Sequence, residues 1–191
     1  MSDPDTLLML EFQKGDASSF ETLMRKYYAR IFNFIYRFVG SREVAEDLTQ
    51  EVFIKVHQAA PTYQPRAKFQ TWVYTIAKNI SLNELRRKKF SGVSIDDSVP
   101  TQEGQVKRQV EDVDAPNPSK EIEKKEAAQV VQEAVQSLPE NQRMAVVLRR
   151  YEKLSYEDIA KTMDMSVSAV KSLLSRARES LRQSLAGYMR Q

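Results

Sequence analysis

Cysteine is absent from the sequence, and glycine, proline and histidine are scarce, with five, seven and one among 191 residues. Without cysteine, neither a disulfide framework nor a thiolate metal site can form. So few glycines and prolines favour helices over a fold rich in β-turns. An enzyme is poorly supported, because His57 is the single histidine and no phosphate-cradling glycine-rich loop occurs. We therefore expect no catalytic residue, no metal and no cofactor.

Long apolar runs are missing as well. No stretch of roughly eighteen apolar residues occurs, so we expect no transmembrane helix. The first five residues, Met1 to Asp5, are acidic and lack the basic start of a secretory signal. The protein is accordingly expected in the cytoplasm, without insertion into a membrane.

The formal net charge is only +3, but the charges fall in blocks. Residues 64–92 carry seven basic and one acidic side chain, and residues 165–191 carry five and one. Between these blocks, residues 93–126 carry nine acidic and five basic side chains. Basic blocks on helical surfaces indicate a polyanionic partner such as nucleic acid.

The first half of the chain shows the apolar spacing of three helices. Ser18 with Glu21 predicts a capping box at the start of the first helix, and Gly40 predicts its end. The second helix runs through Val44–Val56, and the third covers about Phe69–Lys89. The stripe on the first helix consists of Phe20, Leu23, Met24, Tyr27, Tyr28, Ile31, Ile35, Phe38 and Val39.

Residues 91–116 lack a sustained apolar period and are rich in polar and acidic side chains. Such a composition is typical of a flexible linker. No internal repeat relates the segments on its two sides. The expected architecture is all-α, with two small helical domains at 1–92 and 118–191 joined by an acidic linker at 93–117.

Helices resume after the linker, one ending at Leu138 and the next beginning with Pro139 at its first position. A helix-turn-helix is then predicted over residues 155–178. Ser155 with Asp158 caps its first helix, and Asp164 suits the turn because Asp tolerates left-handed backbone. Taken alone, the second helix could also be an ordinary solvated basic helix. Its polar face, which can reach base edges or phosphates, presents Ser168, Lys171, Ser172, Ser175, Arg176 and Arg178.

Residues 63–90 combine aromatic and basic side chains. Aromatic faces stack on unpaired bases while neighbouring cations follow the phosphates, which is typical of single-stranded DNA binding. Phe69, Trp72 and Ile76 also share helical spacing, so part of this set must be core, and Trp72 can serve both roles. The set comprises Tyr63, Phe69, Trp72 and Tyr74 with Arg66, Lys68, Lys78 and the run Arg86 to Lys89.

Several motifs, in this order and spacing, resemble the extracytoplasmic-function sigma factors of bacterial RNA polymerase. They lie at residues 45–56, 69–79, 138–143, 154–160 and 170–178. The resemblance covers nearly the whole chain outside the linker. It implies a transcription initiation factor that is not itself an enzyme, with sigma region 2 in the first domain and sigma region 4 in the second.

The resemblance implies two partners: core RNA polymerase, through its clamp coiled coil and flap, and promoter DNA, both duplex and single-stranded. In this family an Asp-Leu-x-Gln-Glu segment contacts the clamp, which here means Asp47, Gln50 and Glu51. An acidic helical face suits a basic partner. Without the resemblance, the same acids would be read as a solvated face.

The resemblance also implies where the promoter is bound. Region 2 would open the minus-ten element and hold an unstacked base in a pocket. The matching positions are Lys55, Tyr63, Trp72, Ile76, Asn79, Arg86 and Arg87. Region 4 would read the minus-thirty-five element through Lys171, Ser172, Ser175 and Arg176, with Arg149 at the backbone. Two departures are Asn83, where relatives often have Asp, and Ser175, which is smaller than its counterpart in some relatives.

The resemblance also implies how the activity of the protein is regulated. Members of the family serve stress or envelope responses, and many are held inactive by an anti-sigma factor that is often anchored in the membrane. Such a partner is a candidate here, and it would hold a nucleoid-associated cytoplasmic protein at the membrane. The alternative function is a stand-alone helix-turn-helix regulator, which tight operator binding without polymerase would favour. That alternative does not explain why residues 47–55 match the extracytoplasmic-function sigma factors.

Overall fold

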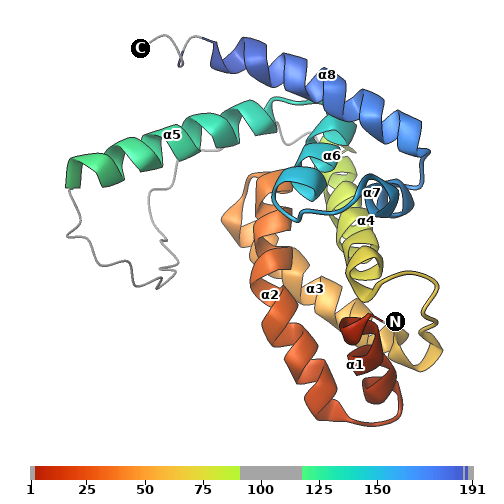
Figure 1. Ribbon diagram of the computed structural model, residues 1–191. Helices are drawn as coiled ribbons and strands as arrows, with labels where there is room; N and C mark the ends of the chain where they lie inside the picture. Colours follow the sequence, from red (N-terminus) through yellow and green to blue (C-terminus); the bar gives the residue numbers. More distant parts are fainter. Residues whose placement is uncertain (1–2, 91–117, 187, 189–191) are drawn as a thin grey trace.

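A computed structural model describes residues 3–90, 118–186 and 188, with the backbone alone for residues 118–125 (Figure 1). Throughout this part of the chain the regular structure is helical and includes no strand, which confirms the expected all-α class. The predicted linker at 93–117 lies outside the described residues. The helices are α1 (Pro4–Gln13), α2 (Ala17–Val39), α3 (Arg42–Ala59), the 3-10 turn η1 (Ala60–Thr62), α4 (Phe69–Phe90), α5 (Pro118–Gln136), α6 (Glu140–Arg150), α7 (Tyr156–Met163) and α8 (Val167–Leu185).

Helices α2, α3 and α4 pack together, and α1 lies against α2 (Figure 1). Aromatic pairs join these helices: the ring centroids of Phe34 and Tyr74, like those of Tyr27 and Phe69, lie 5.2 Å apart in edge-on contact. Such contacts add to the burial of large apolar surfaces. Most of the predicted α2 stripe is buried, whereas Tyr28 is 40% exposed and belongs to the surface.

The two ends of α2 show why a helix stops and starts. Gly40 adopts the left-handed backbone (φ 83°) that ends the helix, as predicted. The predicted capping box at Ser18 and Glu21 is wrong. The helix begins earlier, at Ala17, because the Asp16 carboxylate accepts the Ser18 backbone N–H at 3.0 Å. Glu21 pairs instead with Arg25 at 2.7 Å.

Helix α1 was not expected from the sequence. The side chain of Asp3 accepts the Thr6 backbone N–H at 3.2 Å, and Pro4 takes the first helical position. The hydroxyl of Tyr27 and the ammonium of Lys26 both bond to the buried carboxylate of Asp5, at 2.6 and 2.5 Å. These polar contacts hold α1 against α2. Polar contacts produce no apolar period in the sequence, so the helix could not be predicted from such a period.

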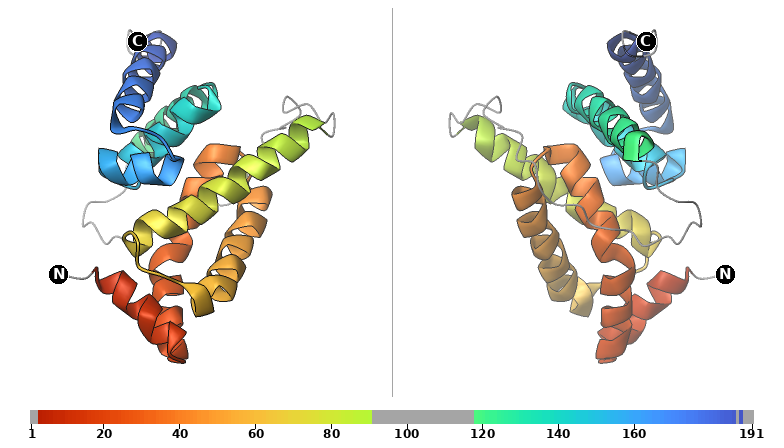
Figure 2. Two further views of the ribbon diagram at one scale, coloured as in Figure 1. Left: turned by 90° about the vertical axis from the view of Figure 1, so that its right-hand side faces the viewer. Right: turned by 90° about the vertical axis from the view of Figure 1, so that its left-hand side faces the viewer.

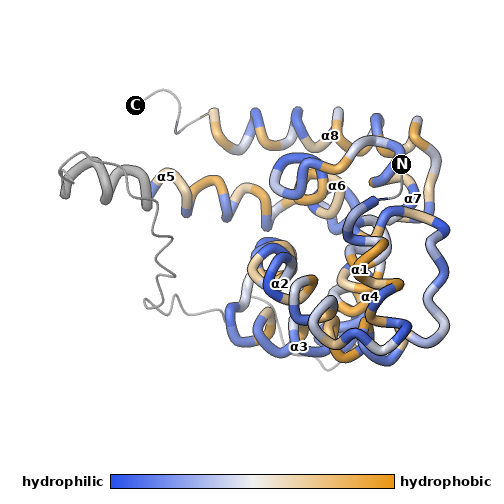
Figure 3. The backbone as a smooth tube through the Cα atoms, turned by 60° about the horizontal axis from the view of Figure 1, so that its bottom comes forward, coloured by the Kyte–Doolittle hydropathy of each residue, from blue (hydrophilic) through white to orange (hydrophobic). Residues whose placement is uncertain are grey.

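The C-terminal helices form a second cluster in which α8 packs on both α6 and α7. Helix α8 alternates between hydrophobic and hydrophilic residues along its length, as expected for a helix with one buried side (Figure 3). Helix α5 starts at Pro118 and ends at Gln136, two residues before the predicted end at Leu138. Helix α6 begins at Glu140, so Pro139 is its N-cap residue rather than its first helical residue.

The two clusters pack against each other (Figure 2). Helix α7 lies on α4, and α6 and α5 lie on α2. Buried side chains from both halves therefore join one continuous hydrophobic cluster.

Candidate polymerase and nucleic-acid interfaces

The acidic positions of α3 share one exposed face. Asp47, Gln50 and Glu51 are all exposed, whereas Leu48 and Val52 on the other side of the helix are buried. This division follows from the helical period, which places residues three and four apart on the same side. The face is open to solvent and can meet a basic partner, although Glu51 also pairs with Lys55 at 3.8 Å.

Helix α4 carries a second functional stripe. Trp72, Ile76, Asn79, Asn83 and Arg87 follow one another at intervals of three or four, so they line a single side of the helix. Trp72 and Ile76 are half-buried, and the other three are exposed. The stripe therefore changes from aromatic and apolar at the start of the helix to polar and basic toward its end.

A hollow of about 490 Å³ lies between α3 and α4. Lys55 and Glu51 line it from α3, and Ile76, Asn79 and Arg87 line it from α4. The structure thus brings together four of the seven predicted minus-ten residues. It also places them directly beside Glu51 of the predicted polymerase-binding set.

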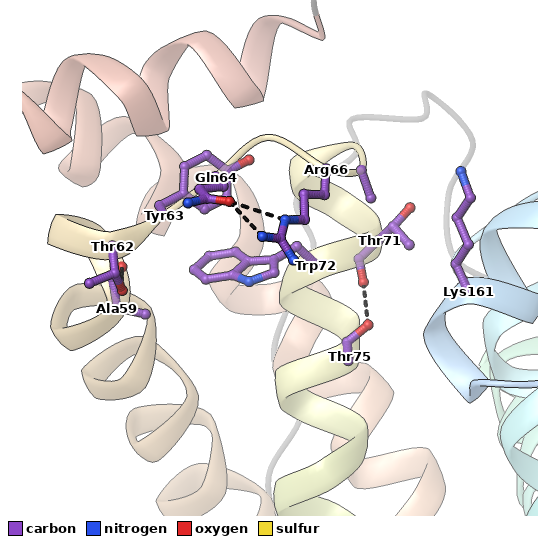
Figure 4. A pocket seen from close by; sticks show the side chains of 10 residues that line it. Ala59, Thr62, Tyr63, Gln64, Arg66, Thr71, Trp72, Thr75 and Lys161 are labelled. Atoms are coloured by element: carbon purple, nitrogen blue, oxygen red, sulfur yellow. Dashed lines mark hydrogen bonds between the residues drawn. The ribbon is translucent and has the colours of Figure 1, made fainter.

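Trp72 and Tyr63 line a different hollow, of about 430 Å³, at the start of α4 (Figure 4). Tyr63 is 5% exposed, and its ring meets the indole of Trp72 edge-on at 4.8 Å. Burial raises the pKa of the Tyr63 phenol. The rim is polar: the side-chain oxygen of Gln64 accepts from Arg66 Nε and Nη2 at 3.1 and 2.8 Å. Trp72 is thus partly exposed to solvent, and the buried ring of Tyr63 packs against it.

The segment over this hollow is held by α1, which sequence reasoning missed. The side-chain amide of Gln13 donates to the carbonyls of Ala60, Pro61 and Tyr63 at 2.9, 3.1 and 3.2 Å. Asp3 accepts the backbone N–H of Phe69 at 3.1 Å, so the same carboxylate caps both α1 and α4. An Asp-Pro pair ahead of an apolar run is the sequence signal that could have revealed this helix.

Arg86 and Arg87 are exposed near the end of α4. Arg87 pairs with Glu84 at 2.9 Å one turn back, while its own side chain stays largely exposed. Both residues are exposed and lie about two helical turns beyond Asn79. A DNA strand running along the stripe of α4 would bring its phosphates close to these two side chains.

Helices α7 and α8 have the geometry of a helix-turn-helix. Ser155 accepts the Asp158 backbone N–H at 3.0 Å, which confirms the predicted cap of α7. Asp164 takes the predicted left-handed conformation (φ 54°) in the turn, and Ser166 caps α8. Val170 and Ala177 of α8 are buried against the other helices.

The polar face of α8 is open to solvent. Lys171, Ser172, Ser175 and Arg176 are all exposed, on the side away from the buried residues. Arg149 has internal contacts: its Nη1 donates to the carbonyl of Leu154 at 2.8 Å, and its guanidinium lies 4.8 Å over the Tyr156 ring. These contacts steady the chain entering α7, and a DNA contact by Arg149 stays a prediction.

The described segments offer neither a metal site nor a membrane-spanning helix. No group of three His, Asp or Glu side chains in them could hold a metal ion. No helix in them is both long and apolar enough to cross a membrane.

Comparison with known proteins identifies both helical clusters. The Sigma-70 region 2 family matches residues 23–91, and the Sigma-70 region 4 family matches residues 128–181. The RNA polymerase sigma-H factor of Pseudomonas aeruginosa is 34% identical over 99% of this chain and 97% of its own length. The extracytoplasmic-function (ECF) RNA polymerase sigma-E factor of Escherichia coli K12 is 35% identical over 93% of the chain and 92% of its own length. The chain belongs to the extracytoplasmic-function sigma factors.

Solved structures of similar fold agree with this membership. CnrH, solved with the cytosolic domain of CnrY, superposes with a TM-score of 0.69 at 18% identity and covers 97% of this sigma factor. RpoE of Bartonella quintana, solved with the anti-sigma factor NepR, superposes with a TM-score of 0.66 at 21% identity and covers 89%. Because both Sigma-70 regions match and the relatives are sigma factors, a stand-alone helix-turn-helix regulator is set aside. The α1 helix precedes the region 2 match and lies outside it.

Proposed function

We propose that this sigma factor binds core RNA polymerase, directs it to specific promoters and melts their minus-ten element. The observation that carries the proposal is the arrangement on region 2, where the acidic face of α3 adjoins the aromatic and polar stripe of α4. Region 2 would occupy residues 1–92 and region 4 residues 118–191, with residues 93–117 as the acidic linker. No catalytic residue and no cofactor is required of this chain.

Polymerase contact is assigned to Asp47, Gln50 and Glu51. Their exposure and the charge of two of them suit a basic surface such as the clamp coiled coil, and complementary charge raises both specificity and association rate. We assign a second contact, with the polymerase flap, to region 4. Both contacts rest on family membership and on accessibility.

The minus-ten element would be opened on the stripe of α4. The exposed part of Trp72 can stack against the last paired base, and the two hollows beside the stripe can receive an extruded base. Unpairing and unstacking cost a few kcal/mol, which base contacts and phosphate contacts must offset. The residues assigned here are Lys55, Tyr63, Trp72, Ile76, Asn79, Arg86 and Arg87, with Tyr63 acting as the buried support of Trp72.

The minus-thirty-five element would be read in duplex form by α8. A recognition helix enters the major groove with its exposed polar face, and Arg and Lys there bind guanine edges or phosphates. The assigned residues are Lys171, Ser172, Ser175 and Arg176, with Arg149 beside the backbone. Weak modules joined by a tether gain effective concentration once both sites are engaged.

Regulation by an anti-sigma factor is part of the proposal. Two solved structures of this fold are complexes of a sigma factor with a regulator, CnrY in one and the anti-sigma factor NepR in the other. We propose a comparable partner for this protein, in a stress or envelope response. Its site of action would be the cytoplasm, at the nucleoid or held near the membrane by that partner.

Transcription reconstituted from purified parts tests the proposal. The protein is added to core polymerase with fragmented genomic DNA, and transcript starts are mapped by sequencing; a shared promoter sequence ahead of the starts is expected. Replacing Asp47 and Gln50 by Ala should reduce core binding and all promoter-specific starts together. Glu21→Ala is the matched control, because Glu21 is an exposed acid on α2 rather than α3 and pairs with Arg25 at 2.7 Å. Starts without a common promoter would refute the function.

A further inference from the structure

The exposed side of α3 that carries the acids also carries an apolar residue, Ile54. It follows Asp47, Gln50 and Glu51 by seven, four and three positions, so the helical period places all four on one side. Ile54 is 55% exposed, and among the described side chains of large apolar residues only that of Phe90 is more exposed. The helix does not need an apolar residue here, because Ile54 faces away from the core and Ile forms helices less readily than Ala, Gln or Lys.

Aromatic side chains of α2 continue the apolar surface. Helices α2 and α3 lie side by side (Figure 1). The ring of Tyr28 stacks on that of Phe53, the residue before Ile54, with centroids 5.9 Å apart. Farther along α2, the rings of Phe32 and Tyr36 stack at 6.1 Å. Tyr28 and Tyr36 are 40% and 36% exposed. A single exposed apolar residue is common on proteins, but here a row of partly exposed rings adjoins it.

Acidic side chains border this apolar surface. Asp47 and Glu51 lie beside Ile54, and Glu43 is exposed one turn before Asp47. Protein interfaces combine an apolar centre, which supplies most of the affinity, with a charged rim that guides the approach. The partner that fits is a protein surface with an apolar seat surrounded by Lys and Arg. DNA does not fit, because its phosphates would meet carboxylates.

Region 4 packs on other parts of region 2 and leaves this face open. The Gln136 amide donates to the carbonyl of Arg37 at the end of α2 at 2.5 Å, and Arg143 Nη1 donates to the next carbonyl at 2.7 Å. At the start of α4, Asp158 accepts from Lys68 Nζ at 3.2 Å. Helix α3 packs on α2, α4 and η1, all within region 2. The exposed side of α3 is therefore accessible to a partner in this arrangement.

We propose that Ile54 is the apolar anchor of the polymerase contact, seated in an apolar hollow of the polymerase surface that Lys or Arg side chains surround. This inference rests on the proposed polymerase contact and names the residue on which its affinity depends most. Asp47 and Glu51 form the rim and keep part of their water, whereas Ile54 loses its water completely. Tyr28 and Tyr36 widen the buried patch on the side of α2.

Ile54→Ala measures the anchor, and Leu7→Ala is the matched control, because Leu7 is an aliphatic residue on α1 that is 46% exposed. Each full-length variant is titrated with core polymerase. Ile54→Ala should bind about tenfold more weakly than the control, because the exposed part of the side chain beyond Cβ can no longer be buried. Its unfolding midpoint should be equal or higher, since Ala forms helices more readily than Ile. Ile54→Leu keeps an apolar side chain and should restore the affinity.

Salt distinguishes the anchor from the rim. Ions screen exposed charges but do not weaken the burial of apolar surface. The loss caused by Ile54→Ala should therefore be as large at about 0.5 M salt as at about 0.1 M salt. The loss caused by Asp47→Asn should shrink over the same range.

Equal affinities of Ile54→Ala and Leu7→Ala for core polymerase would overturn the anchor. If the Asp47 and Gln50 substitutions still reduce core binding in that case, the proposed function stands and the anchor alone is refuted. A fall of several degrees in the unfolding midpoint of Ile54→Ala would also overturn it, because Ile54 would then stabilise the fold instead of the contact.

Discussion

Gln13 offers the sharpest test of how α1 supports the minus-ten surface. Gln13→Leu keeps the size of the side chain and removes the amide that donates to three carbonyls over residues 60–63. The contact to Pro61 is exposed and water can replace it, whereas those to Ala60 and Tyr63 are partly buried. At about 0.5–1.5 kcal/mol for each neutral hydrogen bond, the two buried contacts contribute about 1–3 kcal/mol. For a domain of about 90 residues, such as region 2, a loss of 2 kcal/mol lowers the unfolding midpoint by roughly 8–16 °C.

Thermal unfolding and permanganate reactivity of promoter thymines give the two readouts. The Leu variant should unfold earlier and open the minus-ten element less, while its affinity for core polymerase is unchanged because α3 is untouched. Gln58→Leu is the control, since Gln58 is exposed on α3. An unfolding free energy and a promoter opening equal to those of the control would show that α1 does not support this segment.

Three further changes are expected to have measurable effects. Arg176→Ala should weaken binding to one promoter class by about 1–3 kcal/mol if Arg176 reads a base, and equal losses on all DNA would reduce it to a phosphate contact. Gly40→Ala should cost about 1–2 kcal/mol in unfolding free energy, because its φ of 83° strains any residue with a Cβ, whereas Gln136, 3.4 Å from the added atom, is at ordinary contact distance. Burial raises the pKa of Glu152 above its ordinary 4.5, against the opposing effects of Tyr74, Arg30 and Arg37. The folded protein then binds a proton at Glu152 more readily than the unfolded one, so acidification from pH 7 toward pH 5 should favour folding through this group, and Glu152→Gln should remove that contribution from the pH dependence of the unfolding midpoint.

Much of the fold could be predicted from the sequence, because the apolar period and the helix caps depend on residues close together in the chain. The α2 stripe, its end at Gly40, the bounds of α4 and the cap at Ser155 all follow from residues within a turn or two of each other. Family membership followed from motifs whose residues are close in sequence, and the comparisons confirm it. Whether the assigned residues bind polymerase and DNA stays a prediction.

What the sequence did not reveal depends on partners far apart in the chain. Helix α1 is fixed by Asp3, Asp5 and Gln13, which bond to residues more than one helix away. The start of α2 shifted because Asp16 is a charged acceptor next to the predicted hydroxyl cap. The packing of the two halves uses single polar side chains such as Arg143 and Asp158. No period in the sequence marks such pairs.

The capping of α2 by region 4 has a consequence for how the polypeptide assembles. Gln136 and Arg37 are 99 positions apart, so their contact must wait until the second half of the chain has been synthesised. The entropic cost of closing so long a loop grows only slowly with its length. Contacts between residues so far apart in the sequence nevertheless form late in folding. Domains emerging from the ribosome fold from the N-terminus onward. Each newly made molecule therefore has an interval in which region 2 is folded while the Arg37 carbonyl at the end of α2 lacks the Gln136 amide that donates to it.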